Sequence, residues 1–243
     1  MSKLTNRFFV SSLANKLFNP ATLPFNYGSC CLLSTLVNTA KPSPTEPWFT
    51  VSYIAIGEAL LGGSCREENF SKLAACLKTT PFKLRKFEVI PACREEIEST
   101  ISSHTKSYDL VLVSGGMGPQ HKTKIYEIVA AMYNQHLSYH QPTIDRMKEI
   151  NLLSGRTSNP ELPQEKKDMA KFPIKAKVVY PCTTQWSPIV IVDNQVHIVS
   201  SFPNIFQRLV CNYFNAPVAE FLNLNPTMPE NKHQKKQVSM LPS

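Results

Sequence analysis

Long apolar segments are missing from this chain of 243 residues. The longest candidate, around Cys30 to Val37, contains Ser and Thr and is far shorter than the roughly 20 residues that cross a bilayer. Hydrophobic residues nevertheless make up 42% of the chain and charged residues 18%, which is typical of a globular protein. The sequence therefore argues against a transmembrane segment and predicts one domain with a buried core.

Cysteine pairs of the C-x-x-C type are also missing. The chain has seven cysteines, an odd number, and two of them, Cys30 and Cys31, are adjacent. The others are scattered and lie mostly within apolar patterns, so we expect buried or idle thiols in a reducing compartment and no disulfide framework. These are Cys65, Cys76, Cys93, Cys182 and Cys211.

Acidic residues are absent from the first 45 residues, which contain four basic ones. The tail from Glu230 is basic as well, so the two ends supply most of the net charge of +8. A nucleic-acid-binding protein usually carries its positive charge on the folded surface. The charge distribution therefore predicts no nucleic-acid partner.

The two ends of the chain differ in composition from its middle. Residues 1–46 are rich in Ser, Asn and Leu and resemble a mitochondrial transit peptide, which predicts a mitochondrial location. The alternative is a disordered basic extension without a targeting role, which leaves a cytoplasmic location open. The proline-rich stretch Lys41 to Pro47 ends this segment, residues 47–222 form the predicted α/β domain, and residues 223–243 form a predicted disordered basic tail.

Strand and helix patterns alternate through the middle of the chain. Alternation of this kind predicts a three-layer α/β/α sandwich with a mostly parallel sheet. Asp193 and Asn194 are expected to form a hairpin turn between two late strands. Strands are expected over residues 49–56, 84–90, 110–113, 176–180, 189–192 and 196–200, and helices over 70–77, 94–101, 125–133, 142–150 and 205–213.

The stretch SGGMGPQH, which begins at Ser114, joins a predicted buried strand to a predicted helix. Glycines allow successive main-chain N–H groups to point into one concavity, and a helix N-terminus adds positive partial charge there. The pattern therefore predicts a site for a phosphate group, although a simple tight turn would have the same composition. It matches neither the G-x-G-x-x-G nor the Walker pattern.

The same stretch resembles the SGG-x-GPTHDD signature of the molybdopterin-binding superfamily. The residues from Ile56 to Leu77 are similar to a second motif of that superfamily, IGDE-[IL]-L-x-G-x-x-x-DTN-x-x-x-LA-x-x-L. Two later segments, from Asp168 to Pro173 and from Trp186 to Phe206, resemble its KMA-x-x-P and PG-[VI]-P regions. The nearest relatives are expected among competence-damage-inducible proteins and the N-terminal region of eukaryotic FAD synthases.

This resemblance implies a pocket for a pterin, a flavin or an ADP-ribose-type nucleotide, built from the first and third βα turns. Some members of the superfamily hydrolyse a pyrophosphate bond with a divalent metal ion, and others belong to molybdenum cofactor biosynthesis. The sequence leaves a homo-oligomer open. The residues carried over as ligand- or phosphate-binding are Gly57, Asn69, Ser114, Gly115, Gly116, Gly118, Pro119, His121 and Lys122.

The acidic positions of the superfamily are partly lost. The two aspartates that follow the histidine are replaced by Lys122 and Thr123, and the closing P-G-[VI]-P reads SSFP. Glu58 and Glu67 remain as candidate ligands for Mg²⁺ or another divalent cation, or as solvated side chains. We therefore expect a nucleotide- or flavin-binding domain that is either a metal-dependent FAD or ADP-ribose pyrophosphohydrolase or a catalytically inactive ligand-binding homologue.

His136 and His140 are four residues apart. This spacing would place two metal ligands on one face if the segment were helical. Neither an HExxH motif nor an obvious third ligand accompanies them, so a metal site here is the less favoured interpretation.

Overall fold

The computed structural model describes residues 49–116, 125–154 and 161–216. All of them belong to one compact unit. The predicted transit peptide, the basic tail and the proposed domain boundaries lie outside the described residues. Within these ranges no helix combines the length and apolarity needed to traverse a bilayer.

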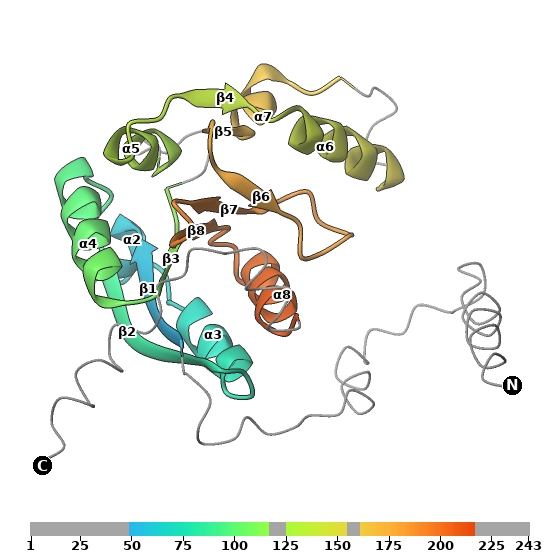
Figure 1. Ribbon diagram of the computed structural model, residues 1–243. Coiled ribbons are helices and arrows are strands. Elements are labelled where there is room, and N and C mark those ends of the chain that lie inside the picture. The colour runs from blue at the N-terminus through green and yellow to red at the C-terminus, as the bar shows by residue number, and fades with distance from the viewer. Residues whose placement is uncertain (1–48, 117–124, 155–160, 217–243) are drawn as a thin grey trace, which may run out of the picture. The chain divides into compact units, whose positions relative to one another are not determined.

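A six-stranded sheet forms the centre of the domain, in the order β2-β1-β3-β8-β7-β6 (Figure 1). The first four strands are parallel, whereas β7 runs antiparallel to β8 and β6 antiparallel to β7. This confirms the mostly parallel sheet. The strands are β1 (Phe49–Ile56), β2 (Phe82–Ile90), β3 (Leu110–Ser114), β6 (Lys177–Val179), β7 (Ile189–Val192) and β8 (Val196–Val199).

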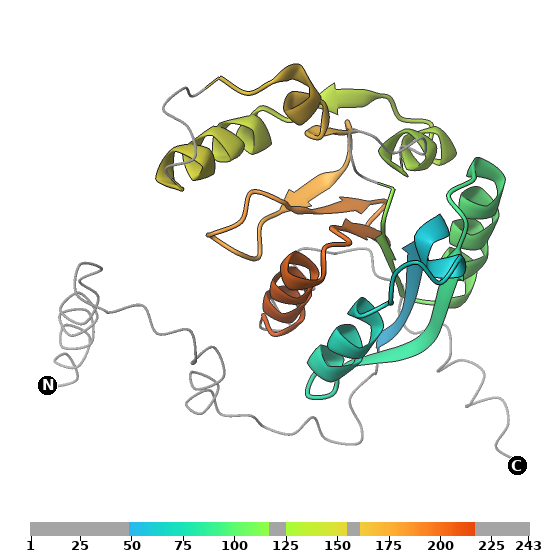
Figure 2. The same ribbon diagram turned by 180° about the vertical axis from the view of Figure 1, so that it is seen from behind.

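Helices cover both faces of this sheet, as the two opposite views show (Figures 1 and 2). The helices α3 (Asn69–Leu77) and α8 (Pro203–Phe214) pack on one face, and α4 (Arg94–Ser107) and α5 (Ile125–Met132) pack on the other. Every residue of β3, β7 and β8 is buried, because these strands have apolar layers on both sides. The expected three-layer α/β/α architecture is therefore confirmed.

A smaller lobe follows α5 along the chain. It consists of the antiparallel pair β4 (Leu137–Tyr139) and β5 (Lys171–Pro173) with α6 (Gln141–Leu153) and α7 (Gln164–Asp168). Arg146 on α6 donates hydrogen bonds of 2.8 Å to three carbonyl oxygens in the loop before β7, and so fixes that loop against the lobe. The sequence predicted only α6, because the two strands are too short for a pattern to emerge.

The interpretation of His136 and His140 as ligands on one helix face is wrong. The two histidines flank the strand β4, and His140 is the N-cap residue of α6. The chain leaves its helical path before them, where Asn134 adopts a left-handed φ of 51°. His140 Nδ1 lies 2.8 Å from the Thr143 hydroxyl, within the first turn of α6.

We expected every cysteine to be a free thiol, and this is wrong for two of them. Cys76 on α3 and Cys211 on α8 form a disulfide across a sequence separation of 135 residues. Both lie on helices that pack side by side on the same face of the sheet, which cannot be seen from the sequence. Cys65, Cys93 and Cys182 are free thiols.

The predicted hairpin turn between β7 and β8 is confirmed. Asp193 and Asn194 have φ angles of 52° and 55°, which are the left-handed values of a two-residue hairpin loop.

Candidate functional site

The carboxyl ends of β1, β3 and β8 lie side by side at one edge of the sheet. Ala55 pairs with Ser114, and Ser114 pairs with Val199, so the residues that follow these strands are neighbours. The chain leaves β1 for α3 on one face and leaves β3 for α5 on the opposite face. In open α/β sheets, ligands bind in the crevice at such a switch point. We refer to the region around Gly57, Ser114–Gly116 and Ser200–Ser201 as the crevice.

Two consecutive glycines turn the chain at the end of β3. Gly115 has a φ of 102° and Gly116 a φ of 68°, both in the left-handed region that side chains disfavour. A Cβ atom on Gly115 would overlap the carbonyl oxygen of Ile56 on β1. The Gly116 carbonyl accepts a hydrogen bond of 3.2 Å from the Ile125 N–H, which holds the first turn of α5 beside the end of β3.

The buried side chain of Tyr53 on β1 links Ser114, at the end of β3, to Glu67, before α3. Its hydroxyl lies 2.8 Å from Ser114 Oγ and donates to Glu67 Oε1 at 3.2 Å. Since the phenol has one proton and the carboxylate can only accept, Ser114 donates to the Tyr53 oxygen. Burial raises the pKa of Tyr53 far above its ordinary value, so the phenol is neutral. No sequence motif singles out Tyr53, although the hydroxyl of a tyrosine in a buried strand requires a partner.

Glu67 acts on the N-terminus of α3. Its carboxylate accepts the main-chain N–H groups of Asn69 at 3.0 Å and Phe70 at 2.8 Å, in addition to the Tyr53 hydroxyl. These are N–H groups that a helix leaves without intrahelical partners. Glu67 is therefore held in place by three donors.

The carboxylate of Glu58 faces a different neighbour. It belongs to the short helix α2 (Glu58–Leu61) and accepts the N–H of Ala92, after β2, at 3.1 Å. Among the described residues, the two glutamates predicted as metal ligands thus have no hydrogen-bond partner in common. Within the described ranges, no group of three or more His, Cys, Asp or Glu side chains could hold a metal ion.

Asn69 joins the crevice from the first turn of α3. Its side chain is buried, with 6% exposed, and Nδ2 donates to the Ser201 carbonyl at 2.9 Å. Among the described residues Oδ1 has no hydrogen-bond partner, which is a costly arrangement for a buried acceptor. Gly57 N–H donates to the Ile90 carbonyl at 3.1 Å and ties the first turn to β2.

The structure therefore brings six of the residues predicted from the sequence to one place. They are Gly57, Glu67, Asn69, Ser114, Gly115 and Gly116. The remaining motif residues Gly118, Pro119, His121 and Lys122 lie outside the described residues.

A cavity of about 250 Å³, referred to below as the aromatic cavity, adjoins the crevice. Ser200 and Ser201, which follow β8, belong to its lining. The sequence analysis did not predict it, because its side chains come from distant stretches that only the topology unites. Its aromatic lining residues are Tyr126, Phe172, Trp186 and Phe202.

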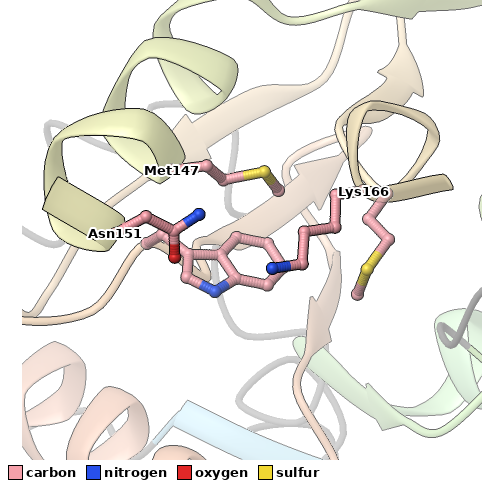
Figure 3. Close-up of a pocket in the computed structure, with 5 residues that line it drawn as sticks. Met147, Asn151 and Lys166 are labelled. Atoms are coloured by element: carbon pink, nitrogen blue, oxygen red, sulfur yellow. The ribbon is translucent and has the colours of Figure 1, made fainter. Parts of the chain in front are cut away.

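A second, smaller cavity of about 60 Å³ lies in the lobe (Figure 3). Figure 3 shows Met147 and Asn151 on α6 facing this cavity, and Lys166 reaching toward it from α7. Trp186 and Met169 line both cavities, so the two cavities are neighbours.

Comparison with known proteins places the chain in a family. Residues 52–203 match the family described as "Probable molybdopterin binding domain", so the chain belongs to the molybdopterin-binding domain family. A CinA-like protein of Anaeromyxobacter dehalogenans (strain 2CP-C) is 33% identical over 129 residues, which are 53% of this chain and 31% of that protein. A probable FAD synthase of Caenorhabditis briggsae is 27% identical over 107 residues, 44% of this chain and 20% of that protein.

The crystal structure of the protein CinA from Thermoplasma acidophilum has the same fold. It superimposes with a TM-score of 0.54 at 22% identity, over 67% of this chain and 94% of that one. The matched part of the chain spans less than a third of each of the two curated relatives described above. The fold and family predicted from the sequence motifs are thus confirmed.

Proposed function

We propose that this domain binds a nucleotide or a flavin through its phosphate groups, in the crevice at the carboxyl ends of β1 and β3. The observation that carries this proposal is the pair of left-handed glycines, Gly115 and Gly116, joined by a hydrogen bond to the first turn of α5. A glycine-rich turn and a helix N-terminus together favour a bound anion. The relatives named as FAD synthases support a flavin nucleotide as the ligand.

The charges around the crevice are compatible with an anionic ligand. The carboxylate of Glu67, which contacts the crevice through Tyr53, is already compensated by the N-terminus of α3. Asn69 contributes a buried carbonyl oxygen that lacks a donor in the described residues, and a ligand hydroxyl or amine would supply one.

Binding without turnover is favoured over metal-dependent hydrolysis of FAD or ADP-ribose. Cleavage of a diphosphate requires a cation held by carboxylates. Glu58 instead accepts a main-chain N–H group after β2, and Glu67 accepts two in the first turn of α3. The sequence also has Lys122 and Thr123 where the family motif has aspartates. The described side chains thus do not fit a metal ion. Binding of a pterin in molybdenum cofactor biosynthesis remains the alternative that the family suggests.

Substitution of Gly116 tests the binding site. We expect Gly116→Ala to weaken the binding of FAD and ADP-ribose, measured by titration calorimetry, by about tenfold or more, because it disturbs hydrogen bonds to a charged group. Gly63→Ala is the matched control, since Gly63 has a φ of 70° against 68° for Gly116 and has open space around its missing side chain. Equal affinities in both variants, or no binding of any phosphate-bearing ligand to the unaltered protein, would refute the proposal.

Incubation with FAD and Mg²⁺, followed by chromatography, distinguishes binding from hydrolysis. We expect no release of FMN and AMP from the unaltered protein. The double substitution Lys122→Asp and Thr123→Asp restores the acidic pair of the family motif, and release of both products by this variant alone would attribute the inactivity to these two positions. Release of both products by the unaltered protein would contradict the proposal of binding without turnover.

A further inference from the structure

The aromatic cavity has the composition of a binding site for a flat ring. Four of its ten described lining residues are aromatic, and the buried Ser187 and Ser200 add hydroxyl groups. Ligand pockets combine apolar walls with a few polar groups in this way. Its volume of about 250 Å³ is below the range of about 300–1,000 Å³ that holds a whole drug-sized ligand, so it suits one part of a nucleotide.

Phe202 presents an aromatic ring at this cavity although it is 68% exposed. Its main chain is fixed, because its carbonyl accepts the Phe206 N–H at 2.8 Å in the first turn of α8. Pro203, the next residue, begins the helix. A large aromatic side chain that is left largely uncovered gains contacts when another flat ring stacks on it.

Other aromatic side chains line the same cavity from different elements. Trp186 comes from the loop before β7. Tyr126 on α5 and Phe172 on β5 pack edge to face, with ring centroids 5.0 Å apart and an interplanar angle of 62°. This packing holds the two rings against each other.

The aromatic cavity and the turn at Gly115 and Gly116 are adjacent at two places. Ser200, in the cavity, follows Val199, which pairs with Ser114 beside the glycines. Tyr126 follows Ile125, whose N–H donates to the Gly116 carbonyl. Adjacent strands are about 4.8 Å apart, so one ligand can place a phosphate at the glycines and a ring in the cavity.

We propose that the aromatic cavity binds the planar heteroaromatic ring of the ligand, a flavin, pterin or purine, and that Phe202 stacks on this ring. This inference rests on the proposed function, because it assigns a binding place to the ring of the ligand whose phosphate groups bind at the crevice. Phe202 is then a specificity-determining residue of this chain, at a position where the family motif has Val or Ile.

Fluorescence of Trp186 tests the inference in the full-length protein. The chain has two tryptophans, so Trp48→Phe leaves Trp186 as the single reporter. In this background, riboflavin, a free pterin and adenosine supply rings without phosphate, and inorganic pyrophosphate supplies phosphate without a ring. We expect at least one ring compound to quench the fluorescence of Trp186 in a saturable way. The compound that binds most tightly of the three identifies the preferred ring.

Two variants distinguish binding of the ring from binding of the phosphate groups. We expect Phe202→Ala to weaken the binding of the ring compound and of FAD by about tenfold and to leave pyrophosphate binding unchanged. Gly116→Ala has the opposite effect, weakening pyrophosphate and FAD only. Leu153→Ala, at an 80% exposed position outside the cavity, is the control, and melting curves of each variant verify the fold.

Each failure has its own signature. Absence of quenching by all three ring compounds, or unchanged FAD affinity in Phe202→Ala while Gly116→Ala loses it, overturns the ring site and leaves the proposed function standing. Quenching by a ring compound that depends on Phe202, without any binding of pyrophosphate, supports the ring site and overturns the phosphate site.

Discussion

At the scale of single residues, Glu67 has the most consequential set of contacts. It compensates the N-terminus of α3 and accepts the hydroxyl of Tyr53, which in turn receives a hydrogen bond from Ser114. One side chain thereby links a helix, the first strand and the third strand at the crevice. The structure gives Glu67 a positioning role that its place in the DTN-like motif did not reveal.

Removal of this carboxylate has a predictable cost. We expect Glu67→Ala to lower the free energy of unfolding by about 1–3 kcal/mol, because the Tyr53 hydroxyl and two helix N–H groups lose their acceptor. Urea denaturation followed by circular dichroism measures the change. Glu67→Gln keeps an acceptor oxygen and should recover part of the loss.

The neighbouring Glu68 is the matched control. It is exposed and pairs with Lys72 four residues later, an arrangement worth less than about 0.5 kcal/mol. Equal destabilisation by Glu68→Ala and Glu67→Ala would mean that the hydrogen bonds of Glu67 do not contribute to stability.

At the scale of elements, α3 and α8 form a pair that is linked at both ends. Asn69, at the start of α3, donates to the Ser201 carbonyl just before α8, and Cys76 and Cys211 join the later turns of the two helices. The first link lies in the crevice and the second lies about two helical turns away. The position of α3 at the site therefore depends on a covalent bond remote from it.

Reduction of the Cys76–Cys211 disulfide should destabilise the domain. Because the bond closes a loop spanning 135 residues, we expect a loss of about 2–4 kcal/mol in the free energy of unfolding. Denaturation with and without dithiothreitol measures it, and the double variant Cys76→Ala, Cys211→Ala should be insensitive to the reductant. Cys182→Ser, which alters a free thiol, is the control. An unaltered protein that unfolds identically in both conditions would contradict the prediction.

Elements with long, regular patterns could be predicted from the sequence, and short ones could not. The apolar runs of β1 and β7 gave the observed bounds, since full burial leaves a continuous hydrophobic signal. The helix expected over residues 94–101 extends to Ser107, because its later turns are polar and carry little periodicity. The three-residue strands of the lobe are defined by pairing between distant segments, which no local pattern encodes.

The same distinction holds for the candidate site. Gly57 and the two glycines directly follow strands, and Ser114 is the last residue of one, at positions where a motif and the topology of parallel sheets indicate function. The aromatic cavity combines residues from Tyr126 to Phe202, and their proximity arises only when β8 is placed beside β3.

At the scale of the whole molecule, buried histidines determine how stability responds to acid. His197 on β8 is fully buried, and burial lowers its pKa to about 4. The Gln195 carbonyl can only accept, so His197 Nδ1 donates to it and Nε2 accepts from the Tyr213 hydroxyl at 2.9 Å. Burial also lowers the pKa of His104 and His140. Burial thus lowers the pKa of all three histidines, so each of them makes the folded state less stable as the pH falls.

Stability should therefore fall below neutral pH. An unfolded histidine has a pKa of about 6.5, so the unfolded chain takes up protons first as the pH decreases. The contribution of His197 is complete above about pH 6.5 and declines as the pH falls to about 4, by about 3 kcal/mol. Urea denaturation at pH 7.5 and pH 4.5 should show a smaller decline in His197→Gln than in the unaltered protein. His136→Gln, at an exposed position, should behave as the unaltered protein, and equal declines in all three would contradict the assignment.

Trp186 and Met169 line both the aromatic cavity and the smaller cavity of the lobe. A shift of either side chain toward the smaller cavity would enlarge the aromatic cavity. If the aromatic cavity binds a ring as proposed, the space available to that ring depends on the positions of Trp186 and Met169, and so on the lobe residues that line the smaller cavity with them.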